Sequence, residues 1–225
     1  MFGIRVTVPI ACFRKGLARE YLETEPLPPP STCYGFLLSL VGETSRKRHI
    51  GCRVAPVLIG KPRQSVVLRT VWRLKKMPLG SPGNTRPDYQ QLLSLVELVV
   101  WLDSSGEREP GSSLEERTRD ALADPARVAR FGGLSLGEST HLVDEVTPIE
   151  RYLQSPRFQR QQPRPRGQAF LLAERGRITL PVWVDHVGSA GTRHVTGDLH
   201  GDWPMDRVPE VAAMPAIEPP EGEAA

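Results

Sequence analysis

Proline and glycine interrupt this chain so often that long helices have little room to form. The sequence holds 22 proline and 20 glycine residues among its 225, and both residue types collect in turns and loops. A chain of this length forms one large domain, or one domain with a smaller addition. The pattern favours a loop-rich α+β or β protein over a helical bundle.

Two elements are predicted near the N-terminus. Apolar and polar residues alternate over residues 2–10, which predicts a half-buried strand. After the proline-rich segment 25–30, Ser31 is the expected N-cap of a helix that ends at Gly42. Its apolar face carries Tyr34, Leu37, Leu38 and Val41.

The next segments are rich in β-formers. Residues 50–59 and 65–75 are separated by GKPRQ, and a hairpin between them is the simplest interpretation. Its second strand would carry Arg69, Arg73 and Lys75 on one face. Residues 77–87 predict an exposed finger, and residues 91–103 predict a central strand with a helical turn around Tyr89 at its start.

The C-terminal half mixes a helix, a loop and short strands. Ser113 and Glu116 have the spacing of a capping box, which predicts a helix ending before Asp124. Residues 131–139 form a glycine-rich loop, followed by a short strand at 142–146. Segments 169–174 and 177–184 predict a second hairpin with Pro181 on an edge strand, and the tail from Pro204 is expected to be disordered.

Basic residues are concentrated in two tracts. Residues 44–87 contain eleven Lys or Arg and no Asp or Glu, although the formal net charge of the chain is only +3. Residues 151–173 contain five Arg and again no acid. Cations facing phosphates release counterions, so these tracts indicate a polyanion partner. Solvated loops are the alternative explanation.

The remaining composition bears on the compartment. Cys12, Cys33 and Cys52 have the spacing of neither a disulfide framework nor a zinc site, and we expect buried free thiols. No apolar run is long enough to span a bilayer, and the N-terminus lacks the features of a signal peptide. We therefore expect a cytoplasmic protein with no membrane partner.

Two motifs suggest other chemistry, and both are incomplete. Asp198, His200 and Asp202 match a metallophosphoesterase motif, but no histidine follows to complete a two-metal site, so we expect an ordinary loop and no metal. Residues 132–139 have P-loop glycine spacing with Glu138 in place of the phosphate-binding lysine. The glycines could instead present backbone N–H groups to an RNA phosphate, or form a tight crossover.

An RNA-cleaving set is a further possibility. His49, with Tyr34 or Lys75, has the residue types for metal-independent general acid and base catalysis at a 2′-hydroxyl. Nothing in the sequence brings these groups together, and the other histidines are expected to be ordinary surface or core residues.

Three motifs in register resemble a known family. They are the opening strand with residues 11–14 (ACFR), the segment 28–40 (PPPSTCYGFLLSL) and the loop 131–140 (FGGLSLGEST). Together, over residues 1–148, the chain resembles the CRISPR-associated Cas-five family, a RAMP subunit of type I Cascade complexes, and is most similar to its DevS-like branch.

The resemblance implies a fold and a role. The fold would be an α+β, ferredoxin-like or RRM-like RAMP domain over residues 1–148, with a β-hairpin thumb at about 60–90. A basic linker and a small C-terminal β subdomain would follow at 149–203, then the tail at 204–225. The role would be a non-catalytic subunit, without cofactor, that grips the 5′ handle of the crRNA and caps the guide filament near the PAM end.

The implied partners are crRNA, a backbone RAMP subunit, a large subunit and a guide-processing endonuclease, with target DNA contacted indirectly. One branch of the family cleaves pre-crRNA itself, which keeps a metal-independent endoribonuclease as the alternative. Bases of single-stranded RNA could stack on Tyr34 or Trp72. The expected RNA-binding residues are Arg14, Lys15, Ser31, Tyr34, Arg69, Arg73, Lys75, Lys76, Arg86, Gly132, Gly133 and Gly137.

Overall fold

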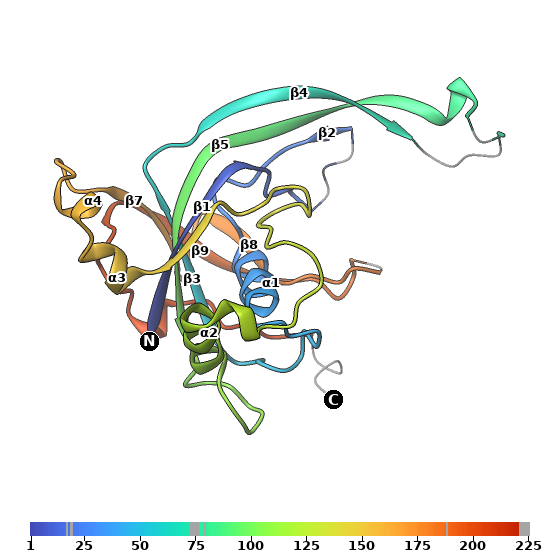
Figure 1. Cartoon of the computed structure of the whole chain (residues 1–225). Helices are drawn as coiled ribbons and strands as arrows, with labels where there is room; N and C mark the ends of the chain where they lie inside the picture. The colour runs from blue at the N-terminus through green and yellow to red at the C-terminus, as the bar shows by residue number, and fades with distance from the viewer. Residues whose placement is uncertain (17, 19, 73–76, 79, 188, 221–225) are drawn as a thin grey trace.

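The computed structural model describes residues 1–16, 18, 20–72, 77–78, 80–187 and 189–220, with the side chains of 71 and 72 left out. Its strands form one sheet in the order β6-β1-β5-β3-β7-β9-β8, with β2 and β4 also paired to β5 (Figure 1). The strands are β1 (Phe2–Ala11), β2 (Tyr21–Leu22), β3 (Arg53–Ile59), β4 (Arg63–Trp72), β5 (Thr85–Asp103), β6 (Glu145–Pro148), β7 (Arg166–Leu172), β8 (Ile178–Trp183) and β9 (Arg193–Pro204). The helices are α1 (Pro30–Leu40), α2 (Leu114–Ala123), α3 (Ile149–Leu153) and α4 (Pro156–Gln159), with short 3-10 turns at Pro82–Asn84, Pro125–Arg127 and Val211–Ala213.

The α+β class is confirmed. In chain order, β1, α1, β3, β5, α2 and β6 follow the β-α-β-β-α-β succession of the ferredoxin-like motif. Every neighbouring pair in the order β6-β1-β5-β3 is antiparallel. β6 starts three residues later than the strand predicted at 142–146.

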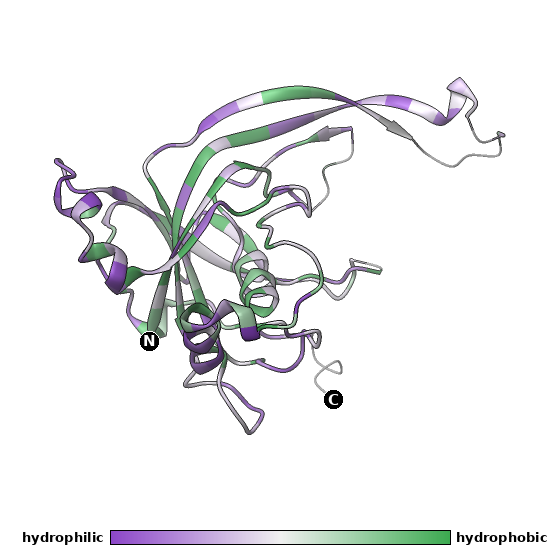
Figure 2. Ribbon diagram, in the orientation of Figure 1, coloured by the Kyte–Doolittle hydropathy of each residue, from purple (hydrophilic) through white to green (hydrophobic). Residues whose placement is uncertain are grey.

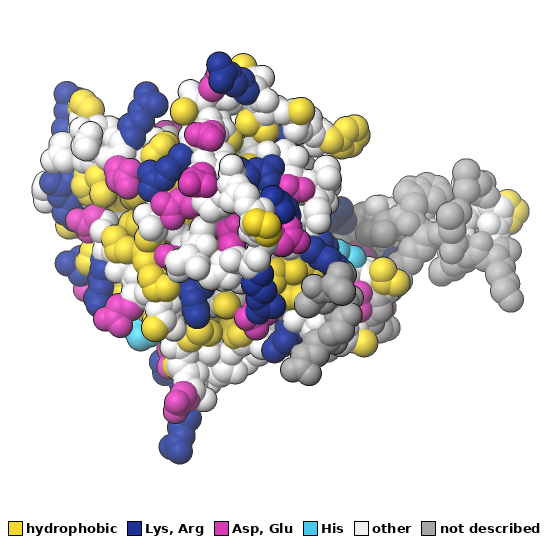
Figure 3. All heavy atoms as spheres, turned by 90° about the horizontal axis from the view of Figure 1, so that it is seen from below, with side chains coloured by type: hydrophobic (Ala, Val, Ile, Leu, Met, Phe, Trp, Pro, Cys, Tyr) yellow, Lys and Arg dark blue, Asp and Glu magenta, His cyan; other side chains and the backbone are white. Residues whose placement is uncertain are grey.

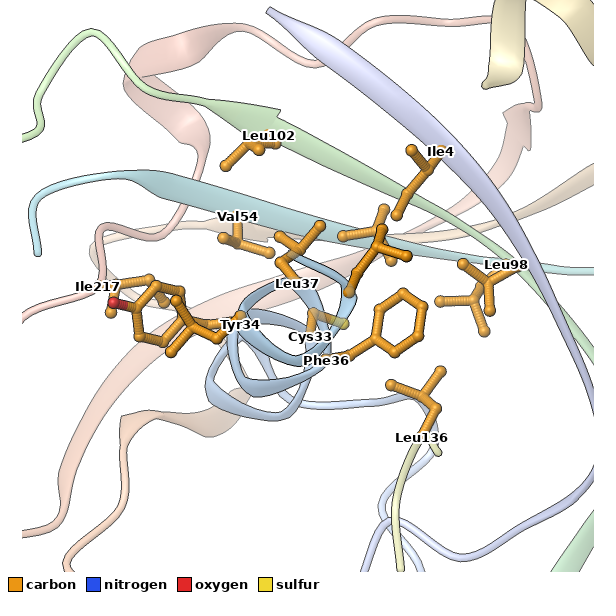
Figure 4. Close-up of a cluster of buried hydrophobic side chains, with 14 of the residues drawn as sticks. Ile4, Cys33, Tyr34, Phe36, Leu37, Val54, Leu98, Leu102, Leu136 and Ile217 are labelled. Carbon is orange, nitrogen blue, oxygen red and sulfur yellow. The ribbon is translucent and has the colours of Figure 1, made fainter. Parts of the chain in front are cut away.

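Helix α1 supplies much of the core on one side of the sheet. Its predicted apolar face is buried, and Figure 4 shows Cys33, Phe36 and Leu37 among side chains from the sheet. The predicted N-cap is wrong: Pro29 is the N-cap, Pro30 begins the helix, and Ser31 lies inside the first turn. Proline fits the first helical position because it has no N–H to leave unpaired there.

Helix α2 begins and ends as predicted. The Ser113 Oγ accepts from the Glu116 N–H at 3.2 Å, and the Glu116 carboxylate accepts from the Ser113 N–H at 2.9 Å. This capping box satisfies donors that the first helical turn leaves free. The helix stops at Ala123, before Asp124 and Pro125.

The predicted hairpin between 50–59 and 65–75 is wrong. β3 pairs with residues 97–103 of β5, and β4 pairs with residues 85–94 of the same strand. β5 is 19 residues long, so it serves both strands, and the chain passes from one to the other at Gly60, which has φ +68°. Tyr89 lies within β5, so the predicted helical turn is also wrong. The true hairpin, β4 with the first half of β5, projects from the body and ends at the predicted finger (Figure 1).

The C-terminal strands also pair differently from the prediction. β7 and β8 flank Arg175 and Gly176 but do not pair with each other, because β9 lies between them. The expected loop around Asp198 and His200 is therefore a strand, whose glycines and mixed polar residues hide any alternation. Pro181 is on the edge strand β8, as predicted. Because β7 pairs with β3, these strands continue the sheet of residues 1–148.

The prediction of a disordered tail is wrong for residues 204–220. Met205, Met214 and Ile217 are at most 1 % exposed. The Ile217 N–H donates to the Cys52 carbonyl at 2.8 Å, and the Ile217 carbonyl accepts from the Gly51 N–H at 2.9 Å. Prolines suit an extended segment, and the interspersed apolar side chains fix it to the core. Residues 221–225 lie outside the described residues.

β1 is buried on both faces instead of one. Ile4 and its neighbours on the first face join the main core, whereas Arg5, on the second face, is covered by Tyr152 of α3 at 4.1 Å from guanidinium to ring centre. The three cysteines are buried free thiols, as predicted. None of the helices in the described ranges is long and apolar enough to cross a membrane.

Candidate nucleic-acid interface

A cleft opens where α1, the glycine-rich loop and β8 meet. It has a volume of about 340 Å³. Three of the predicted RNA-binding residues line it, namely Ser31 and Tyr34 from α1 and Gly137 from the loop. The fold thus brings together two motifs that are about a hundred residues apart in the chain.

Two cleft residues were missed by the sequence analysis. The Arg46 guanidinium stacks over the Trp183 ring at 3.8 Å and donates to the Val184 carbonyl at 2.7 Å. Arg46 belongs to the first basic tract, but the only sequence feature that includes Trp183 is the end of the strand predicted at 177–184. Their contact spans 137 positions, so no local pattern could have revealed it.

The two predicted RNA-binding residues of α1 in the cleft differ in their hydrogen bonding. Tyr34 is only 4 % exposed, and its hydroxyl donates to the Arg46 carbonyl at 2.8 Å. Burial raises the pKa of Tyr34 well above its ordinary value. Its ring is therefore not free to stack on a base. The Ser31 Oγ is buried and has no hydrogen-bond partner among the described residues.

The glycine-rich loop is pressed against the end of β1. A Cβ on Gly137 would lie 2.6 Å from the Cys12 carbonyl oxygen, and its φ of +101° also requires glycine. The His141 Nδ1 accepts from the N–H groups of Cys12, at 3.2 Å, and Glu138, at 3.1 Å. This histidine therefore ties the loop to the strand.

The loop leaves backbone donors unused. Within the described part of the chain, the N–H groups of Gly132, Gly133 and Gly137 meet no acceptor. Gly132 and Gly137 have positive φ, and Gly132 and Gly133 are both exposed. Successive free N–H groups of this kind can hold an anion.

The hairpin carries two different faces. Directly opposed residues of β4 and β5 share a face, so Val67, Arg69, Asp88 and Gln90 form the inner face, towards the glycine-rich loop. The Arg69 Nη1 contacts the side chains of Gln90 and Glu138, the latter at 3.4 Å, and the Gln90 Nε2 donates to Glu138 at 3.0 Å. The inner face and the loop therefore form one surface.

The expectation of an unopposed cationic tract needs correction. Acids pair with several of the predicted contacts. Glu138 and Glu20, from distant segments, pair with Arg69 and Arg86, and the nearby acids Asp88 and Glu23 pair with Arg86 and Lys15. Folding therefore mixes charges that the sequence separates, and the face in Figure 3 shows both signs intermingled.

Arg14 is the predicted contact that stays open. It is exposed and forms no ion pair with the described residues. It follows Cys12 by two residues, and the Cys12 carbonyl packs against Gly137, so Arg14 lies close to the loop. Arg73, Lys75 and Lys76 lie outside the described residues, as does the side chain of Trp72.

The proposed catalytic histidine is structural. His49 is 1 % exposed, with Nδ1 at 2.7 Å from the Glu107 carboxylate and Nε2 at 3.0 Å from the Arg117 guanidinium. Burial acts to raise the pKa of Glu107, but hydrogen bonds, first that from His49, hold it below the ordinary value. Both ring nitrogens are occupied, so His49 has no free position facing a phosphodiester.

The metal motif and the second basic tract are also accounted for. Asp198 pairs with Arg177 at 3.1 Å and Asp202 with Arg166 at 2.8 Å, and no metal-ligating cluster occurs among the residues the structure covers.

The arginines of the second basic tract, in residues 151–166, lie around α3 and α4, across the sheet from α1 (Figure 1). The two basic tracts thus do not form one surface.

Comparison with known proteins places the chain in a family. No family model matches it. It is 49 % identical, over 224 residues and 99 % of both chains, to the CRISPR-associated protein Cas5 of Myxococcus xanthus (strain DK1622).

Two solved structures share the fold. One is part of a CRISPR RNA-guided surveillance complex, with 16 % identity, 90 % coverage of both chains and a TM-score of 0.60. The other is a Cas protein, with 19 % identity, coverage of 93 % of this chain and 97 % of that one, and a TM-score of 0.52. The folds of these structures are alike, and the Myxococcus relative is matched along nearly its full length. The chain therefore belongs to the CRISPR-associated Cas5 family.

Proposed function

We propose that this protein is a non-catalytic subunit of a type I Cascade complex that binds the 5′ handle of crRNA and caps the guide filament near the PAM end. Membership of the Cas5 family supports the assignment, as does the likeness of its fold to part of an RNA-guided surveillance complex. Its partners would be the backbone RAMP subunit, the large subunit and the guide-processing endonuclease, in the cytoplasm, with target DNA reached only through the complex.

One observation carries the RNA-binding proposal. The loop that holds the free N–H groups of Gly132, Gly133 and Gly137 lines the α1 cleft through Gly137 and contacts Arg69 through Glu138. Arg14 follows Cys12, against which Gly137 packs, by two residues. Backbone donors and guanidinium groups together suit phosphates, and the cleft has room for a nucleotide splayed from a single strand. Sequence information would come from the hydroxyls and the Arg46–Trp183 pair that line this cleft.

The internal ion pairs do not oppose this role. The Arg69–Glu138 pair is 3.4 Å long, and the side chain of Arg69 is 45 % exposed. Exposed pairs of this kind contribute about 0 to 1 kcal/mol, less than the contact of an arginine with a polyanion. Arg69 would therefore exchange Glu138 for a phosphate when RNA binds.

The test measures the affinity of the purified protein for handle RNA across a salt series. We expect Arg14→Glu with Arg69→Glu to weaken binding roughly tenfold or more and to flatten the salt dependence, since each lost phosphate contact lowers the slope. Arg73→Glu with Lys75→Glu tests the predicted thumb contacts in the same way. Arg127→Glu, at an exposed site on another part of the chain, is the matched control.

Equal affinity and slope in both double variants would remove this surface from the proposal. The same protein, incubated with repeat RNA and EDTA, tests the endoribonuclease alternative. We expect no cleavage, because His49 is buried and bound at both nitrogens. Specific cleavage that His49→Gln abolishes without unfolding the protein would establish the alternative instead.

A further inference from the structure

The outer face of the hairpin carries an exposed apolar patch. Val66 and Leu68 of β4 alternate with the inner-face residues, Leu68 lies opposite Tyr89 of β5, and Tyr21 of β2 pairs beside Tyr89. Their exposed fractions are 49 % for Val66, 64 % for Leu68, 51 % for Tyr89 and 42 % for Tyr21. The two tyrosine rings are 6.4 Å apart, and Figure 2 shows a hydrophobic stretch in the middle of β4.

The patch differs from the inner face in what covers it. On the inner face, Asp88 and Gln90 are 3 % and 2 % exposed and the glycine-rich loop packs nearby. On the outer face, Gln91 donates to the Tyr21 hydroxyl at 3.2 Å, and Val66, Leu68 and Tyr89 remain exposed. Tyrosine and aliphatic side chains free of charge are typical of the centre of a protein interface.

The patch lies beside a free strand edge. In the described chain, β4 pairs with β5 alone, so the other edge of its ten residues has no neighbouring strand. An edge of this length presents unpaired N–H and C=O groups to any extended chain that approaches it. Another strand could add here and cover Val66 and Leu68 with its alternate side chains.

The charges around the patch discriminate between possible occupants. A groove of about 720 Å³ lies at the base of β4, and its walls include Gln64 and Gln91, the latter directly opposite Val66 of the patch. Its basic residues, Lys15, Lys61 and Arg177, are largely offset by Glu23, Glu25 and the Arg177 partner Asp198. Lys61 alone among these cations has no ion pair within the described residues. A polyanion would meet these carboxylates, whereas a single carboxylate on a docked segment could pair with Lys61.

We propose that β4 and the outer face dock an extended segment of a neighbouring protein subunit, which adds as a strand to the free edge. The segment carries apolar residues at alternate positions against Val66 and Leu68, and an acidic residue against Lys61. The inference rests on the proposed membership of a multisubunit complex, but not on the RNA contacts of the inner face.

The first test assembles the protein with its companion subunits and crRNA and purifies the complex through a tag on another subunit. Wild-type incorporation tests membership itself. We expect Val66→Lys with Leu68→Lys to lower incorporation roughly tenfold or more while the free protein keeps its affinity for handle RNA. Val187→Lys, which changes a fully exposed valine elsewhere, is the matched control and should assemble normally.

The second test measures amide hydrogen exchange along residues 63–72 in the free protein, in the protein bound to RNA alone and in the assembled complex. Docking of a strand predicts that alternate β4 amides are protected in the complex and that RNA alone protects none. Protection by RNA alone, or loss of RNA affinity in the double variant, would assign the outer face to nucleic acid and overturn the proposal. Normal incorporation of a folded double variant would overturn it as well, while failure of the wild-type protein to assemble would count against the proposed function.

Discussion

Two arginines on neighbouring parts of the sheet hold glutamates in opposite settings. Arg5 is fully buried on β1, with Nε at 2.5 Å from Glu97 and Nη1 at 2.8 Å from Glu145. Arg69 is nearly half exposed on β4 and contacts Glu138 at 3.4 Å. Both bridge strands to acids far away in sequence, but water reaches only one of them.

The difference separates a structural cation from an available one. Burial acts to lower the pKa of Arg5, but Glu97 and Glu145 hold it above its ordinary value, so its charge is fixed within the fold. Arg69 gains little from its partner and can exchange it for a phosphate. A count of basic residues treats the two as equal, and only burial tells which one can serve a ligand.

The largest effect is expected at the buried site. Arg5→Met should lower the free energy of unfolding by about 3 kcal/mol, because it leaves two acids without their buried partner. Chemical denaturation measures this loss. Adding Glu97→Gln and Glu145→Gln should recover part of it, while the RNA affinity of the folded protein stays unchanged. A mild loss, within the range of exposed pairs, would contradict the distinction drawn between the two arginines.

The elements predicted correctly depend on local patterns. The α1 face repeats every three to four residues, and the Ser113–Glu116 capping box needs only four positions. Pro181 has no N–H to give to a strand on a free edge, so its position also follows from the residue itself. Each of these signals lies within a single helix or strand.

The errors in strand pairing involve partners that are distant in the chain. β3 and β4 share β5 because its 19 residues span both, and β9 inserts between two strands that a short turn joins. The same limit applies to the candidate site. Gly137 and Ser31, both predicted as RNA-binding residues, line the same cleft, but the Arg46–Trp183 contact and the acid opposite Arg69 depend on long-range folding.

Glycine substitutions test whether the open cations depend on the loop beside them. Gly137→Ala should lower stability by about 1 to 2 kcal/mol, since its Cβ would strike the Cys12 carbonyl and its φ is +101°. RNA affinity should fall as the loop is displaced. Gly35→Ala is the matched control, because its Cβ meets nothing within 4 Å in α1 and should raise stability by about 0.5 to 1 kcal/mol. Equal stability of the two variants would show that the loop is not held against β1.

A pH series tests how firmly His141 ties this loop to β1. Burial lowers the pKa of His141, and Arg69 lowers it further against the opposing effect of Glu138. The unfolded chain therefore binds the proton more readily, and stability should be full above about pH 6.5 and fall as the pH drops below it.

The variant His141→Asn isolates that step. Its side-chain oxygen can still accept a hydrogen bond, so the loss below about pH 6.5 should vanish. The loss of stability in stronger acid should remain, because it comes from carboxylates such as Glu43. The hydrogen bond from Arg117, followed by that from the Ser45 N–H, holds the pKa of Glu43 below its ordinary value. Thermal unfolding across the pH range measures both steps. An unchanged first step in the variant would assign it to a different group.

The smallest effect is expected for a pair that is fully at the surface. Arg127 lies 2.8 Å from Asp124, and its side chain is 87 % exposed. Arg127→Ala should change the free energy of unfolding by less than about 0.5 kcal/mol, because water and salt screen both charges. Denaturation at low and high salt measures the change, and a loss approaching that of Arg5→Met would mean that exposure does not separate structural from available cations in this protein.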